Sequence, residues 1–153
     1  MQTEKRPGKS PCCDHENSGI GKSAHFICIS SESGIIQAFE QIKSRLGGEL
    51  NSCLTLLYSI PADLSLPLFK AELDSLEKRF PSRLITYYLF SHPHHPFENS
   101  GRHQQVLEIV INSNTCTRMQ FQVLGQEDFV GMVVERLHFL GIKTYQIKSQ
   151  IIY

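Results

Sequence analysis

Two stretches near the N-terminus carry residue types that bind phosphate or metal. Gly19-Ile-Gly-Lys-Ser23 resembles the end of a phosphate-binding loop. That motif needs a further glycine at the position that holds Glu16, and it follows a strand, whereas this stretch precedes one. Cys12-Cys13-Asp14-His15 offers soft ligands, but structural zinc usually needs four well-spaced ones. We therefore interpret residues 1–23, which are polar and rich in turn-forming residues, as a flexible lead-in.

Three further histidines lie close together at His92, His94 and His95. Imidazole is a common ligand of transition metals. Pro93 and Pro96 stiffen this loop, however, because each fixes one backbone angle. We predict no metal site here.

The short turn Ser31-Glu32-Ser33-Gly34 separates two patterned segments. His25–Ser30 is an apolar run too short for a helix, which predicts a buried strand. Beyond the turn, apolar residues recur at 35, 39, 42 and 46, the spacing of a helix, and Gly47-Gly48 predicts its end. In open parallel sheets ligands bind at such a turn, where the helix N-terminus presents free amides to an anion.

The rest of the chain repeats this alternation of strand and helix. Apolar runs predict strands at Cys53–Tyr58, Leu84–Phe90 and Met119–Leu124, with a last strand in Lys143–Tyr153. Helical spacing occupies Phe69–Phe80 and Asp128–Leu140. His103–Asn112 suits a helix by spacing and a strand by its β-branched residues, and the alternation favours a helix. The order predicts an α/β fold, a doubly wound five-stranded parallel sheet with helices on both faces and His25–Ser30 at its centre.

Length and composition suit a single domain over residues 24–153. The 153 residues are 41% hydrophobic and 20% charged, and 15 basic residues balance 15 acidic ones. Net charge therefore favours neither nucleic acid nor an anionic membrane as a partner. No apolar run approaches the roughly 18–20 residues that cross a bilayer, and no secretory signal opens the chain. Cys28 and Cys53 lie in predicted strands, so we expect buried thiols and a cytoplasmic protein.

With these segments placed, the chain resembles the NAD(P)-binding domain of the ferredoxin–NADP reductase superfamily, and phenylacetyl-CoA oxygenase reductase-like proteins most of all. Four stretches spread over residues 24–153 carry the resemblance: Ser33-Gly34-Ile35, Leu56-Leu57-Tyr58 with Phe69–Leu76, Ser91 with Gly101-Arg102 in the following loop, and Leu137–Ile142. The resemblance implies a sheet with strand order 3-2-1-4-5. It also implies a site for NAD(P) whose residues are Ser33, Gly34, Ile35, Ser59, Ser91, Arg102 and Gly125, with Arg102 facing a nucleotide phosphate.

The sequence departs from the family at several of its working positions. Ser31 and Glu32 replace two glycines that let the pyrophosphate approach the backbone. Ser59-Ile60-Pro61 stands where the family has glycine–asparagine–arginine, and Gln37 where it has a proline. Leu124 replaces the cysteine beside the nicotinamide, and Gln150 replaces a glutamate. These changes predict that any NAD(P) binding is weak.

Two functions follow from the resemblance. The twenty-three residues before the first strand are too few for the family's flavin-binding barrel, so we expect no flavin site within this chain. The chain then acts as a non-catalytic binding or interaction module. Alternatively, it binds NAD(P)H and passes hydride to a flavin on a partner chain, either a flavin-domain or an oxygenase protein. A serine hydrolase has no support, because no nucleophile elbow follows any strand.

Overall fold

The computed structural model describes residues 24–48, 52–61, 67–91, 100–113 and 118–153. The lead-in 1–23 and the histidines at 92, 94 and 95 lie outside these residues, so their predicted roles stay predictions.

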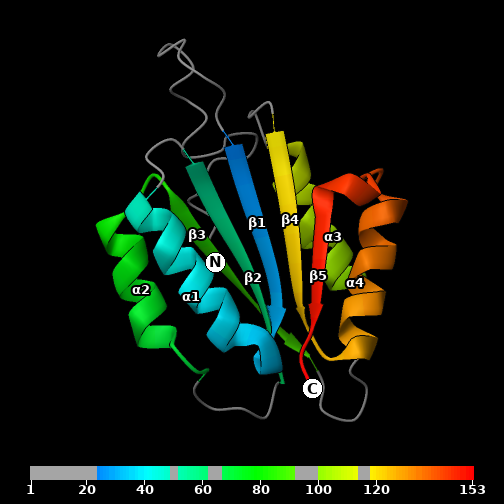
Figure 1. Cartoon of the computed structure of the whole chain (residues 1–153), viewed down its shortest axis with the longest axis horizontal. Helices are drawn as coiled ribbons and strands as arrows, with labels where there is room; N and C mark the ends of the chain where they lie inside the picture. Colours follow the sequence, from blue (N-terminus) through cyan, green and yellow to red (C-terminus); the bar gives the residue numbers. More distant parts are fainter. Residues whose placement is uncertain (1–23, 49–51, 62–66, 92–99, 114–117) are drawn as a thin grey trace.

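One parallel sheet of five strands, in the order β3-β2-β1-β4-β5, runs through the described residues (Figure 1). The strands are β1 (Ala24–Ser31), β2 (Ser52–Pro61), β3 (Leu84–Ser91), β4 (Arg118–Gly125) and β5 (Ile147–Ile151). Every neighbouring pair is parallel, and β1 lies at the centre. The predicted fold class, strand order and central strand are confirmed.

Four helices of the described residues cover the two faces of the sheet. They are α1 (Ile35–Gly48), α2 (Lys70–Arg79), α3 (Ser100–Asn112) and α4 (Glu127–Phe139), with short 3-10 turns η2 (Glu32–Gly34) and η3 (Thr144–Gln146). The helices α1 and α2 lie on one face, and α3 and α4 lie on the other (Figure 1). Because both faces are covered, the central strands read as unbroken apolar runs.

The core is divided by the sheet into two clusters. Side chains of a strand alternate between its faces, so Phe26 and Cys28 pack with α1 and α2, whereas Ile27 and Ile29 pack with α3 and α4. Each of these four side chains is at most 5% exposed. The run that the sequence predicts as a buried strand is therefore buried on both sides.

Several element boundaries differ from the sequence prediction. The helix α1 continues through Gly47-Gly48, where the sequence predicted its end. Phe69 precedes α2 as its N-cap with a left-handed φ of 68°. Gly101-Arg102 belongs to the first turn of α3 and not to the preceding loop. The last strand is confined to Ile147–Ile151, because a 3-10 turn occupies residues 144–146.

The two cysteines in the described strands differ in state. Cys28 is a free, fully buried thiol, and burial raises its pKa to about 12 although Arg45 lies near it. Cys53 is disulfide-bonded, and its partner lies outside the described residues. The prediction of a buried thiol is confirmed for Cys28 and wrong for Cys53.

Arg83 fastens three elements together at the amino-terminal end of the sheet. Its guanidinium donates to the carbonyls of Leu46 (3.2 Å) and Arg45 (3.4 Å) at the end of α1. It also donates to Ser52 O (3.0 Å) and Ser52 Oγ (3.3 Å) at the start of β2. A cation at a helix C-terminus satisfies carbonyls that have no partner within the helix.

None of the described helices combines the length and apolarity that crossing a membrane requires.

Candidate functional site at the carboxyl ends of the strands

The predicted site residues lie at the end of the molecule to which the strand arrows point. Ser33 and Gly34 form the turn after β1, and Gly125 ends β4. Ser59 pairs with Ser31 across β1 and β2, and Ser91 ends β3 opposite Pro61. Arg102 lies in the first turn of α3, and its side chain lies outside what the structure describes. Parallel strands thus bring one end of each element to the same edge, which we call the carboxyl edge.

Ile35 opens α1, but its side chain is fully buried in the core beneath α1 and α2. It contributes apolar packing there. Any ligand contact by Ile35 is therefore restricted to its backbone.

Gly34 brings the start of α1 unusually close to the end of β4. A Cβ placed on Gly34 would lie 2.7 Å from Leu124 Cβ and 2.9 Å from the Leu124 carbonyl carbon. Leu124 itself is fully buried. Glycine is therefore required at this position for packing alone, without any ligand.

Gly125 is surrounded in the same way on the other side of the turn. A Cβ there would lie 2.5 Å from Ser31 Oγ and 2.7 Å from Phe129 Cδ2. The side chain of Ser31 thus fills space beside Gly125 that a bare backbone at position 31 would leave open. Ser31 Oγ also hydrogen-bonds Ser33 Oγ at 3.0 Å, so the hydroxyls of the turn bond to each other.

Glu32 places an exposed carboxylate in this turn, immediately before α1. The N-terminus of a helix attracts anions, and Glu32 supplies one from within the chain. Like charges repel, so a phosphate approaching the same amides would meet an unfavourable interaction.

The Glu32 carboxylate also affects the pKa of Tyr58, which lies near the end of β2. Burial and the charge of Glu32 raise the pKa of Tyr58 to about 12. The nearby backbone of Leu68 lowers the pKa slightly. It does not form a hydrogen bond with Tyr58, so Tyr58 Oη has no partner within the described part of the chain. The Tyr58 side chain is fully buried and lies 6.0 Å from the ring of Tyr88. The tyrosine is therefore held neutral.

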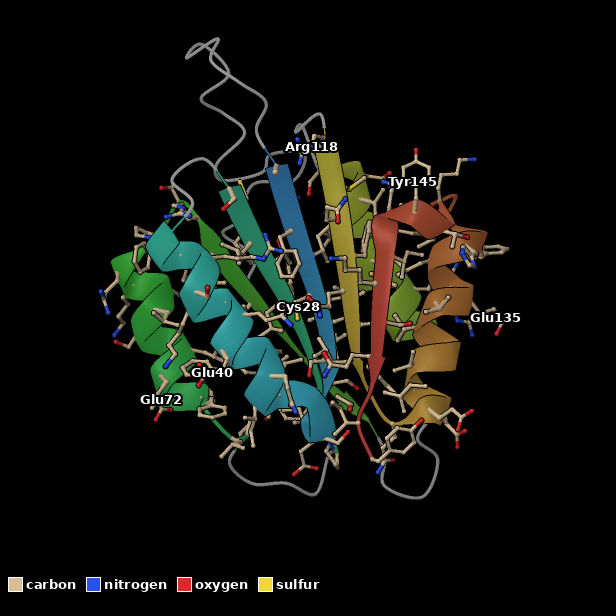
Figure 2. The ribbon with its side chains drawn as sticks, viewed as in Figure 1. Cys28, Glu40, Glu72, Arg118, Glu135 and Tyr145 are labelled. Carbon is tan, nitrogen blue, oxygen red and sulfur yellow. The ribbon has the colours of Figure 1, made fainter. Side chains whose placement is uncertain are left out.

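Acidic side chains also occupy the first turns of two other helices that begin at the carboxyl edge. Glu72 lies in the first turn of α2, and Glu127 and Asp128 lie in that of α4. Figure 2 shows Glu72 at this end of the molecule and Arg118 at the opposite end. Lys70, the basic residue that opens α2, bonds Asp74 at 2.8 Å. Carboxylates thus lie at helix N-termini that attract anions, where a phosphate would meet negative charge.

The described residues hold no cluster of three or more histidine, cysteine, aspartate or glutamate side chains that could bind a metal.

Sequence reasoning missed Tyr58 and Phe129 as neighbours of the turn. Tyr58 is part of an apolar run and Phe129 of a helical stripe, so each is explained locally as core. The Glu32 carboxylate affects Tyr58, and Phe129 crowds Gly125, only because strands that are separate in the sequence end side by side in the sheet.

Comparison with known proteins gives a fold likeness. No protein-family model and no curated protein matches the chain. The CS-b5R domains of human Ncb5or, in the NAD+ form, match with a TM-score of 0.67 and 14% identity over 83% of this chain and 36% of that chain. Ferredoxin–NADP+ reductase from Plasmodium falciparum with 2'P-AMP matches with a TM-score of 0.63 and 17% identity over 84% and 52%. The flavohem-like FAD/NAD-binding domain of nitric oxide dioxygenase from Vibrio cholerae O1 biovar El Tor matches with 0.54 and 14% over 82% and 50%.

The chain has the fold of the NAD(P)-binding domain of ferredoxin–NADP+ reductase-type proteins, which confirms the fold that the sequence resemblance implies. It spans between 36% and 52% of the length of the three structures named. At these identities the likeness concerns the fold alone.

Proposed function

We propose that this chain is a degenerate oxidoreductase-type NAD(P)-binding domain that acts as a non-catalytic binding or interaction module. The observation that carries the proposal is the turn after β1. Its hydroxyls bond each other, the Ser31 side chain lies against Gly125, and the Glu32 carboxylate precedes α1. These groups fit a pyrophosphate poorly, because they replace free amides and open backbone with side chains and negative charge.

Two glycines at the positions that the family resemblance assigns to a nucleotide site support a degenerate site over an unrelated surface. Gly34 and Gly125 keep the close approach of α1 to β4 and of β4 to β1. Loss of affinity is therefore expected to come from the contents of the turn. One adverse or lost charged contact costs about 1–3 kcal/mol. Two such contacts weaken a micromolar site to about millimolar, since roughly 1.4 kcal/mol corresponds to a tenfold change.

The test is titration of the 153-residue chain with NADH and with NADPH, followed by calorimetry or NMR. We expect binding no tighter than about millimolar for the unmodified chain. Glu32→Gln removes only the charge, whereas Glu32→Gly also restores bare backbone, so the two variants separate repulsion from close approach. Glu40→Gln, at an exposed position on α1, is the matched control. Micromolar binding by the unmodified chain overturns the proposal.

A second candidate is an enzyme component that binds NAD(P)H and passes hydride to a flavin on a partner chain. It is favoured by the glycine kept at the end of β4 and by the reductase folds that the chain matches. Ser33, Gly34, Ser91, Arg102 and Gly125 would then line the site. Oxidation of NADPH with free FMN as acceptor, measured with the chain present and absent, tests it. An acceleration that Glu32→Gly increases and Glu40→Gln leaves unchanged would support this candidate over the first.

A further inference from the structure

The strand β5 forms an open edge of the sheet. Among the residues that the structure describes it pairs with β4 alone, as the last strand in the order β3-β2-β1-β4-β5. The Ile152 N–H donates to Gly125 O at 2.8 Å. Backbone direction alternates along a strand, so Ile147, Ser149 and Ile151 point their amides and carbonyls away from β4. The Ile147 N–H donates to Thr144 O. No described residue bonds the other outward backbone groups, so within the described part of the chain they are available to a further strand.

The sequence of this edge is self-complementary. It reads Ile147-Lys-Ser-Gln-Ile151. In an antiparallel pair of two such strands with Ser149 opposite Ser149, Ile147 lies opposite Ile151 and Lys148 opposite Gln150. No charge then faces a like charge, and the two isoleucine pairs share one face of the sheet. In this register the outward-pointing residues face each other as hydrogen-bonded pairs. Three such pairs would give six backbone bonds, and the two Ile147 N–H groups are already used, so four bonds form between the copies.

The flank of α4 beside β5 suits the same arrangement. His138 lies on that flank, because its Nε2 contacts Thr144 Oγ1 at 3.2 Å just before β5. Val134, Gly131 and Glu127 follow on the same side at helical spacing. Gly131 is exposed, and an added Cβ would meet no atom within 4 Å, so a second helix can approach closely there. Two antiparallel α4 helices would place Glu127 of one copy near His138 of the other.

We propose that two copies of this chain associate through antiparallel pairing of their β5 strands about a two-fold axis at Ser149, with their α4 helices side by side. The occupant of the open edge is thus a second copy. Across the dimer interface, Lys148 of each copy lies opposite Gln150 of the other, and Glu127 of each copy lies near His138 of the other. The proposal does not depend on nucleotide binding.

The test begins with the mass of the chain in solution. Size-exclusion chromatography with light scattering should give twice the 17.4 kDa of one chain, decreasing towards one chain on dilution. Ser149→Pro removes an outward N–H that β4 does not use, so the monomer should keep its fold while dimerisation weakens. Losing two symmetric hydrogen bonds of about 1 kcal/mol each should raise the dissociation constant by about tenfold or more. Ser149→Ala, which keeps the N–H, should leave it unchanged.

Two further variants keep the proposal testable if Ser149→Pro fails to fold. Gly131→Gln places a long side chain on the exposed flank of α4 and should also weaken the dimer. Ser149→Cys should be cross-linked into a dimer by a short bismaleimide, because the two Cα atoms of a hydrogen-bonded antiparallel pair lie about 5.5 Å apart, within reach of such a reagent. Glu40→Cys, exposed on α1, is the matched control. A single-chain mass at all concentrations overturns the proposal, as does a dimer that resists Gly131→Gln and gives no cross-link with Ser149→Cys.

Discussion

Gly34→Ala provides a quantitative test of how closely α1 approaches β4. The new Cβ would lie 2.7 Å from Leu124 Cβ and 3.0 Å or less from two backbone atoms of the same residue. Backbone in a central strand cannot rotate away, and Leu124 is fully buried. Overpacking of this kind costs about 1–3 kcal/mol. The alanine also stiffens the unfolded chain, which returns about 0.4–1 kcal/mol.

We therefore expect Gly34→Ala to lower the free energy of unfolding by about 1–2 kcal/mol. This corresponds to a decrease in Tm of about 2–8 °C, at roughly 2–4 °C per kcal/mol for a chain of this size. Gly47→Ala is the matched control. This glycine lies exposed within α1 with no atom within 4 Å of an added Cβ, so the same substitution should stabilise the chain by about 0.5–1 kcal/mol. Thermal and urea unfolding would measure both. A Gly34→Ala chain that melts at or above the unmodified one refutes the packing argument.

Two more perturbations follow from contacts described above. Arg83→Ala should lower the free energy of unfolding, measured with urea, by about 1.5–3 kcal/mol because four acceptors lose a charged donor. Arg83→Lys should recover only part of this loss, since an ammonium cannot reproduce the several N–H donors of the planar guanidinium. Equal stability of all three chains would contradict this prediction. Tyr58 has a pKa raised from 10.0 to about 12, so its contribution to stability is present below pH 10 and lost as the pH rises towards 12. Tyr58→Phe should therefore unfold no more easily at neutral pH and lose less stability over that alkaline range, and an unchanged alkaline profile would count against the assignment.

Much of the fold was predictable because its signals are local. An unbroken apolar run such as His25–Ser30 is typical of a strand buried on both faces. Apolar residues at helical spacing, as at Ile35, Phe39, Ile42 and Leu46, are typical of a helix buried on one face. Their regular alternation leaves a parallel sheet as the consistent arrangement, and the structure confirms it. Boundaries were predicted less well. Gly47-Gly48 continues α1 and Gly101-Arg102 opens α3, because tertiary packing can extend a helix over weak helix formers.

The sequence by itself determined the strand–helix order and the charge of the turn after β1, since both can be read from neighbouring residues. Only the tertiary structure decided what surrounds that turn. Leu124 lies ninety residues from Gly34, and Gly125 still farther from Ser31, yet they touch because β1 and β4 are neighbours in the sheet. The disulfide state of Cys53 and the open edge of β5 are likewise set by which segments lie side by side. Such pairings depend on contacts between distant parts of the chain, to which local periodicity is blind.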